Sequence, residues 1–465
     1  MRPLKIALYI WTVIALLGVV CMVVPDGGWH IGQWNLRFPT LAEALDLKKD
    51  SIADFDVEIM NDSLLAEADL SMPTDSVVQQ DTLASKDSIA QKPQPVIPEV
   101  NVVHTDSRAY LAAFYAALDG TDSIPVRVVH YGDSQLEEDR ITNILREQWQ
   151  KEYGGGGVGL IPLHQTIPTR TIRQKLSING VVQTTQKGPK RYIVYGPRSM
   201  RLTDSDDYGV MGQVAVMDST LVPGSDSVVL QVEPLDKKRK TYHYFSHVRV
   251  LADSSLTVSL SPLADSTTHC EIVLQGTGNV YGISLETDKG VIVDNIPMRG
   301  CSGNIFTKID SVQLSDFYRE TNTKLIILQF GGNMIPQTEN PSTIRGYVRS
   351  TMRQQVRYLR ACAPEAAILF IGPSDMSTNI DGQMTTYPLV PYMDQQFRKM
   401  AQEEGIAYWS MYDAMGGKDS MVRWVENGLA GSDYVHFTRA GANKIGKQLY
   451  HWLMSYQSDS LNTKL

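Results

Sequence analysis

Two groups of polar side chains, far apart in the chain, could together carry out acyl-transfer chemistry. Ser134 lies just after a short apolar run at residues 126–131. Asp433 precedes His436 by three residues, shortly before the last amphipathic stretch. A serine hydroxyl is a poor nucleophile until a base takes its proton, and a histidine oriented by a carboxylate is the usual base. We therefore expect Ser134 to be the nucleophile, His436 its general base, and Asp433 the residue that orients the imidazole.

These side chains need a scaffold that brings them to one place. Residues 126–131 read as a buried strand and residues 141–151 as the helix after it, so Ser134 lies near a strand-to-helix turn. A second apolar strand at residues 325–329 leads to Asn333. Further strand–helix units follow, and alternation of this kind predicts a parallel, doubly wound sheet with its ligands at the carboxyl ends of the strands. Ser134, Asn333 and the loop of His436 are all expected at that edge.

On these motifs the chain resembles the SGNH (GDSL-like) hydrolase superfamily, whose four sequence blocks supply Ser, Gly, Asn and His. The first block matches as Gly-Asp-Ser134 and the third as Phe-Gly-Gly-Asn333. The last block matches as Asp433-Tyr-Val-His436. The second block matches at residues 300–304, where Gly303 fits the oxyanion glycine best.

The resemblance implies roles for further groups around the nucleophile. The backbone N–H groups of Ser134 and Gly303 and the side-chain amide of Asn333 would form an oxyanion hole. Gln135 stands where the family more often has Leu or His. We expect Gln135 either to contact the acyl group of the substrate or to cap the following helix.

A long segment interrupts the strand–helix pattern between residues 165 and 285. Six short apolar runs there are separated by Gly, Pro, Asp and Ser, which is typical of a β-sandwich. The predicted fold is thus an α/β, doubly wound, flavodoxin-like core at residues 101–164 and 286–465, with an inserted β-sandwich. Cell-wall O-acetylesterases and O-acetyltransferases of the SGNH type carry a comparable carbohydrate-binding-like insert. Tyrosines of the segment could stack on sugar rings, although aromatic residues are also ordinary strand formers; they are Tyr192, Tyr195, Tyr208, Tyr242, Tyr244 and Tyr281.

That resemblance predicts a serine esterase acting on O-acetyl groups of an extracytoplasmic, peptidoglycan-like polysaccharide. Its acyl-serine intermediate would pass the acetyl group to water or to a sugar hydroxyl, and transfer would call for a membrane-bound acyl-transfer partner. Two alternatives stay open. One is a lipid esterase or thioesterase of the same superfamily, and the other is a non-catalytic, membrane-tethered glycan-binding scaffold.

The N-terminal part predicts an attachment to a membrane. Residues 6–24 form a stretch of 19 residues without a charge, preceded by Arg2 and Lys5. This is close to the roughly 20 residues that span a bilayer, and the basic flank favours a cytoplasmic N-terminus. We expect a signal anchor at residues 1–25, a single-pass inner-membrane protein and a periplasmic catalytic domain; a cleaved signal peptide is the alternative. Residues 26–100 are polar and read as a largely disordered tether.

Composition argues against several other classes. A net charge of −8 disfavours a nucleic-acid partner. The four cysteines lack zinc-like spacing, and His243, His247 and His269 lack ligand-like spacing, so no metal or cofactor is predicted. The glycine run at residues 154–157 has no following Lys-Ser/Thr, which disfavours a phosphate loop; it predicts a flexible active-site rim or a plain connector. His130 lies within the first strand and reads as a core or rim histidine.

Overall fold

Two compact units make up the chain, Met1–Gln91 and Lys92–Leu465. The computed structural model describes residues 29–31, 34–36, 106–183, 188–203, 205–219, 227–235, 240–264 and 267–462. In the first unit, β1 (Trp29–Ile31) and β2 (Trp34–Leu36) pair as an antiparallel ladder within the segment predicted as a tether. The predicted membrane anchor at residues 1–25 lies outside the described residues, as does most of the tether. Where the structure does describe the chain, no helix combines the length and the apolar character that crossing a bilayer requires.

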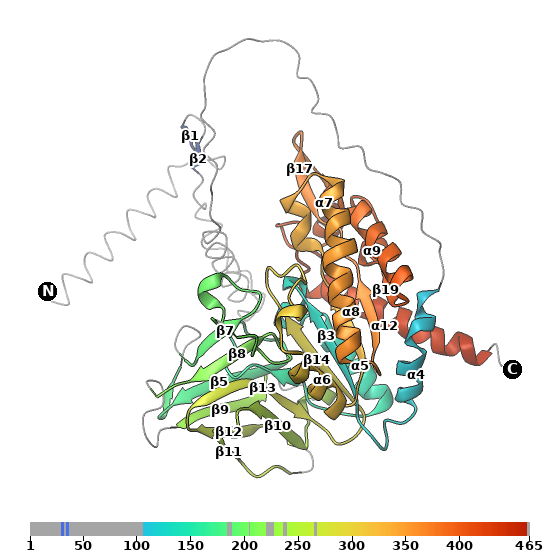
Figure 1. Ribbon diagram of the computed structural model, residues 1–465. Helices are drawn as coiled ribbons and strands as arrows, with labels where there is room; N and C mark the ends of the chain where they lie inside the picture. The colour runs from blue at the N-terminus through green and yellow to red at the C-terminus, as the bar shows by residue number, and fades with distance from the viewer. Residues whose placement is uncertain are drawn as a thin grey trace, which may run out of the picture. The chain divides into compact units, whose positions relative to one another are not determined.

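The second unit contains a five-stranded parallel sheet (Figure 1). Its strands are β3 (Val126–Gly132), β14 (Val291–Pro297), β15 (Thr323–Gln329), β16 (Ala367–Ile371) and β19 (Ala407–Trp409). They lie in the order β14-β3-β15-β16-β19, and each neighbouring pair is parallel. Numbered along the chain this is order 2-1-3-4-5, the flavodoxin-like order, in which the direction of winding reverses between the first and third strands. The predicted α/β class with a parallel sheet is confirmed.

Helices cover both faces of this sheet, which is why its strands are apolar on both sides. All seven residues of β3 are buried, as expected for a central parallel strand. One face packs on α4 (Ala112–Leu118), α5 (Thr142–Tyr153) and α12 (Arg439–Asn462). The other packs on α6 (Ser311–Glu320), α8 (Arg353–Cys362) and α9 (Val390–Glu404). The helical segment that contains α8 is a run of α7 (Pro341–Gly346), a π-helical turn η7 (Tyr347–Met352) and α8 itself.

Between β3 and β14 the chain builds two antiparallel sheets, here called the two-sheet module (residues 159–286). The first sheet contains β4 (Gly159–Ile161), β7 (Lys190–Ile193), β8 (Gln213–Met217), β10 (His247–Ala252) and β13 (Gly278–Glu286). The second contains β5 (Ile172–Ile178), β6 (Val181–Val182), β9 (Ser227–Pro234), β11 (Thr257–Leu260) and β12 (Cys270–Gln275). Buried side chains of both sheets form one shared hydrophobic cluster. Figure 1 shows the module beside the parallel sheet.

The module starts a few residues earlier than the predicted boundary at 165, because β4 pairs with β13. The glycines at residues 154–157 allow the chain to pass closely along the parallel sheet before it enters β4. The backbone of Gly155 packs so closely on Val291 that a Cβ atom would lie 2.6 Å from its N and O atoms, and Gly155 has φ +105°. Val291 begins β14, so the run lies at the amino edge of the sheet, opposite Ser134. The expectation of an active-site rim is therefore wrong, and the run is a tightly packed connector.

Candidate active site

Ser134 occupies a sharp turn at the carboxyl end of β3. The Asp133 carboxylate accepts a hydrogen bond from the Gln135 backbone N–H at 3.0 Å and so caps the short helix η2 (Ser134–Asp139). Gly132 is required just before it, because a Cβ atom there would lie 2.7 Å from the Leu136 side chain. The turn presents the Ser134 hydroxyl at the edge where the sheet order reverses, the usual ligand position in this sheet type.

His436 and Asp433 meet Ser134 in one hydrogen-bonded chain. The Ser134 Oγ atom lies 2.8 Å from His436 Nε2, and His436 Nδ1 lies 2.6 Å from Asp433 Oδ2. The other oxygen, Asp433 Oδ1, accepts the backbone N–H groups of Val435 and His436, each at 3.0 Å. This arrangement can withdraw a proton from the serine hydroxyl and stabilise the resulting imidazolium.

The carboxylate of this chain is held in its charged form. Burial acts to raise the pKa of Asp433. The hydrogen bond and charge of His436 and the two backbone N–H groups lower the pKa by more than burial raises it. The pKa of Asp433 is therefore below its ordinary value. An ionised Asp433 fixes a proton on Nδ1 of the neutral imidazole, which leaves Nε2 free to accept the proton of Ser134.

Gln135 links the serine turn to the histidine loop. Its Nε2 atom donates to Val435 O at 2.6 Å, and its Oε1 atom accepts the Phe437 N–H at 3.4 Å. The side chain is buried at 6 % exposure. Both polar ends thus bind the backbone on either side of His436, which gives Gln135 a positioning role. Contact with an acyl group, expected from the sequence, stays a prediction.

Gly303 and Asn333 come together around Cys301. The Gly303 N–H donates to Cys301 Sγ at 3.2 Å, and Asn333 Nδ2 donates to Cys301 O at 3.1 Å, with Asp133 Oδ2 3.5 Å away. Gly303 has φ +79°, and a Cβ atom there would lie 2.8 Å from the Phe330 ring. The two predicted oxyanion donors are therefore on neighbouring loops beside Asp133, the residue before the nucleophile.

Asp133 is a buried acid that sequence reasoning left without a role. Burial raises its pKa to about 6, although the Gln135 backbone N–H and the charge of His436 oppose the shift. Its position inside the motif Gly-Asp-Ser134 was visible, but only the structure shows its capping bond and its proximity to Asn333.

Three consecutive acids after the nucleophile are buried, and each has an arginine partner. Glu137 receives both Nε and Nη2 of Arg299, at 2.5 and 2.6 Å. Since Arg299 precedes Gly303 on the same loop, this pair ties the serine turn to the loop of the predicted oxyanion glycine. The other pairs are Glu138 with Arg140 and Arg170, and Asp139 with Arg146. Three acids in a row beside a buried strand were the only local signal for this cluster.

The remaining histidines lie away from this chemistry. His130 is fully buried with its Nδ1 3.0 Å from Thr142 Oγ1, and burial lowers its pKa to about 3. It is a core histidine, one of the two places the sequence allowed. Within the described parts of the chain, no three His, Cys, Asp or Glu side chains are grouped as metal ligands would be.

A family model matches the C-terminal part of the described chain. Residues 265–444 match the family model of the GDSL-like Lipase/Acylhydrolase family. The chain carries a GDSL-like (SGNH) hydrolase domain. The matched residues include Gly303, Asn333 and His436, whereas Ser134 lies before the two-sheet module. No curated protein sequence matches the chain.

The first of three similar solved structures shares the fold. One described as a peptidoglycan O-acetylesterase has 19% identity and a TM-score of 0.59, and the match covers 76% of this chain and 98% of that one. An acetyl xylan esterase has 12% identity and a TM-score of 0.27 over 34% of this chain and 80% of that one. The periplasmic domain of a lipopolysaccharide acetyltransferase from Salmonella ser. Paratyphi A has 14% identity and a TM-score of 0.23, over 34% and 69% of the two chains.

Proposed function

We propose that this protein is a serine esterase that acts on O-acetyl groups of an extracytoplasmic, peptidoglycan-like polysaccharide. The observation that carries the proposal is the continuous chain from Ser134 Oγ through His436 to Asp433, at 2.8 and 2.6 Å. The similarity of the fold, over most of the chain, to a peptidoglycan O-acetylesterase supports acetyl esters of a glycan as the substrate class.

The proposed reaction has two stages. In the first, His436 Nε2 takes the proton of Ser134 as its oxygen attacks the ester carbonyl, and a tetrahedral oxyanion forms. The proton then passes to the leaving sugar oxygen, which breaks the ester bond and leaves an acetyl-serine. In the second stage, His436 activates water or another sugar hydroxyl, which takes the acetyl group and frees Ser134.

Oxyanion stabilisation would come from Ser134 N–H, Gly303 N–H and the Asn333 amide. In the structure the Gly303 N–H donates to the thiol of Cys301, a weak acceptor. A developing oxyanion accepts a far stronger, charge-assisted bond, so we expect the Gly303 N–H to turn from the thiol to the substrate.

Acetate release from 4-nitrophenyl acetate and from an acetylated glycan by the purified full-length protein tests the proposal. Adding an unacetylated oligosaccharide measures how the acetyl-serine divides between water and a sugar hydroxyl. The proposal predicts acetate release that is abolished in Ser134→Ala. Turnover of long-chain acyl esters in preference to acetyl esters would favour the lipid-esterase alternative.

We also propose that residues 1–25 anchor the protein in the inner membrane with the hydrolase domain in the periplasm. The support is the charge-free stretch at residues 6–24 with its basic flank. Protease added to cells with a permeabilised outer membrane should cut the hydrolase domain, and protease added to intact cells should not. Protection of the domain in spheroplasts would contradict this orientation.

A further inference from the structure

A stretch of the two-sheet module carries a charge opposite to that of the chain. Residues 188–203, here called the basic strip, contain Lys190, Arg191, Arg198 and Arg201 and no Asp or Glu, in a chain of net charge −8. Three aspartates follow the strip directly, Asp204, Asp206 and Asp207. The strip comprises β7 and the short helix η3 (Arg198–Met200). Such a concentration of one charge in an acidic protein calls for a partner.

The cations of the strip have no carboxylate partner among the described residues. Lys190, Arg198 and Arg201 are exposed. Arg201 donates to the Gly196 carbonyl, and the Lys190 ammonium lies 4.8 Å from the centre of the Tyr192 ring. A side-chain hydrogen bond with Tyr192 and, more weakly, the charge of Asp218 raise the pKa of Lys190. By contrast, the arginines close to the serine turn have carboxylate partners, since Arg140 and Arg299 are each paired with a buried glutamate.

The strip flanks the loop of the predicted oxyanion glycine. A Cβ atom on Gly212 would lie 3.1 Å from the Val194 side chain and 3.2 Å from the Met298 side chain, so Val194 packs close to the residue that leads into that loop. Burial raises the pKa of Tyr195 to about 12; the charge of Arg191 opposes this shift, and the charges of Cys301 and Glu137 add to it. The middle of the strip, at Val194 and Tyr195, therefore lies near the loop of Gly303.

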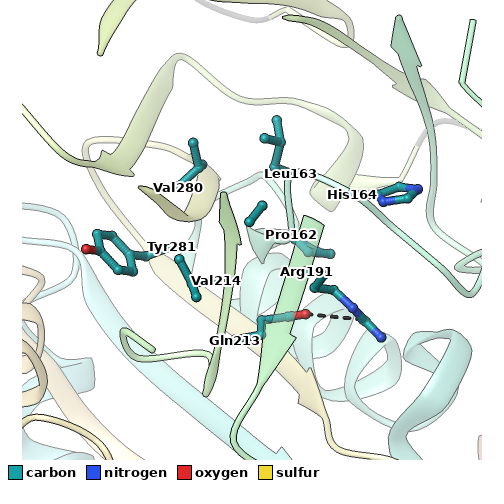
Figure 2. Close-up of a pocket in the computed structure, with 9 residues that line it drawn as sticks. Pro162, Leu163, His164, Arg191, Gln213, Val214, Val280 and Tyr281 are labelled. Atoms are coloured by element: carbon teal, nitrogen blue, oxygen red, sulfur yellow. Dashed lines mark hydrogen bonds between the residues drawn. The ribbon is translucent and has the colours of Figure 1, made fainter. Parts of the chain in front are cut away.

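Arg191, the half-buried cation of the strip, lines a small pocket (Figure 2). Arg191 donates through Nη1 to Gln213 Oε1 at 3.3 Å, and the pocket, about 10 Å³ in volume, is also lined by His164 and Tyr281. The bond to Gln213 engages one N–H of the guanidinium. Arginine's planar fork of N–H donors suits carboxylates and phosphates, which accept two parallel bonds from it.

We propose that the basic strip binds anionic groups of the polysaccharide that carries the ester, so that the substrate is a polyanionic glycan with carboxylates or phosphates along its chain. This inference rests on the proposed function and specifies the charge of the substrate. A neutral glycan would be recognised by stacking and hydroxyl contacts and would gain little from four cations that pair with no carboxylate in the part of the chain that the structure describes.

Binding of unacetylated polymers to the full-length protein tests the inference separately from catalysis. The probes are polygalacturonate for carboxylates, poly(glycerol phosphate) for phosphates and dextran as the neutral polymer. We expect at least one polyanion to bind, dextran not to bind, and affinity to fall at least about 10-fold between 20 and 300 mM NaCl because salt screens exposed charges. The polymer that binds identifies the anionic group.

The variant Arg198→Gln/Arg201→Gln should weaken polyanion binding about 10-fold and leave hydrolysis of 4-nitrophenyl acetate unchanged. The matched control, Arg173→Gln/Arg319→Gln, removes two exposed charges that lie elsewhere, on β5 and at the end of α6, and should bind as wild type does. Adding Arg191→Gln should weaken binding further.

Three outcomes would overturn the inference: no binding of either polyanion, equal binding of dextran, or equal loss in the control variant. A wild-type protein that binds polyanions but releases no acetate would contradict the proposed function and leave the strip as a glycan-binding surface. Normal acetate release without polyanion binding would contradict the proposed role of the basic strip and leave the proposed function intact.

Discussion

At the scale of single residues, the proton of Ser134 has one acceptor in direct hydrogen-bond contact, His436 Nε2 at 2.8 Å. Ser134→Ala removes the nucleophile without leaving a buried group unpaired. We expect kcat to fall by at least about 10³-fold while thermal unfolding stays within about 1 °C, since removing a nucleophile abolishes the covalent route. Ser259→Ala, at an exposed position of β11, is the control and should keep full activity. Wild-type turnover in Ser134→Ala would exclude this serine.

Asp433 acts through His436, so its substitution has a distinct signature. An asparagine side chain at this position would keep the size of the aspartate but could donate an N–H toward Nδ1, which favours the wrong imidazole tautomer. We expect Asp433→Asn to lower kcat by roughly 10²- to 10⁴-fold with little change in KM. Labelling of Ser134 by an organophosphonate should slow in parallel. Unchanged kcat would show that His436 is oriented by other contacts.

Asp133 predicts a pH dependence of stability. Its folded pKa of about 6 lies above the ordinary value of 3.8, because burial disfavours the charged form. The folded state therefore binds this proton more tightly than the unfolded state, and stability from this group falls as pH rises from about 4 to about 6. We expect Asp133→Asn to be more stable than wild type above pH 6, by at most about 3 kcal/mol.

Urea unfolding of both proteins between pH 4 and pH 8 measures that difference. The gap in unfolding free energy should grow through the window from pH 4 to pH 6 and level off above it. A gap that does not change with pH would show that Asp133 has an ordinary pKa in the folded protein.

At the scale of elements, the serine turn and the oxyanion loop are joined by the bidentate Glu137–Arg299 pair. Glu137→Gln leaves Arg299 without its counter-charge and loosens the loop of Gly303. We expect kcat to fall about 10-fold with KM nearly unchanged, since the loss falls on transition-state stabilisation. The double variant Glu137→Gln/Arg299→Gln should recover part of the stability lost in the single one, because no unpaired buried charge remains.

Asp316→Asn is the control for this pair, since it breaks the surface ion pair with Arg319 and should leave kcat unchanged. Equal kcat losses in Glu137→Gln and in the control would refute a role for the pair in positioning. A rise in KM at constant kcat would place Glu137 in substrate binding instead.

Some of these elements could be predicted from the sequence and others could not. The strands predicted at residues 126–131 and 325–329 correspond to β3 and β15 to within two residues, because each is a mostly apolar run that is buried in the sheet. The hairpin of β17 (Ser377–Ile380) and β18 (Gln383–Thr386) was missed, since its residues are largely polar. Its Ser377 N–H donates to Tyr434 O beside His436, a contact between distant loops that no local pattern encodes. The Glu137–Arg299 pair, 162 residues apart, was missed for the same reason.

At the scale of the whole molecule, one buried arginine connects the parallel sheet to the two-sheet module. Arg127 on β3 pairs with Asp294 on β14 at 2.7 Å and with Glu286 at the end of β13. All three side chains are almost fully buried. Arg127→Met would leave the buried Asp294 without its cation, while Glu286 would keep Arg249 at 3.0 Å. Losing the cation of a buried carboxylate costs about 3–5 kcal/mol in comparable pairs.

We expect Arg127→Met to lower the unfolding free energy of the parallel sheet and the module together, in a single transition seen by both near- and far-ultraviolet circular dichroism. Arg173→Met, which breaks the exposed pair with Glu233, should cost less than about 1 kcal/mol. Two separate transitions in Arg127→Met would show that the module folds independently of the sheet.

The strand order has a consequence for how the protein acquires its shape. β3, which carries the nucleophile, leaves the ribosome before either neighbour, because Val126 pairs with Val291 and Arg127 with Thr323. An apolar strand with both edges open is prone to mispairing, and closing so long a loop is slow. The strands of the module are closer to their partners in sequence than β3 is to its own. The module can therefore form before β3 has paired. Pulse-labelled hydrogen exchange during refolding should therefore show early protection of the amides of β9 and β12 and late protection of the amides of β3. The strand synthesised before its partners would then be among the last to form its hydrogen bonds.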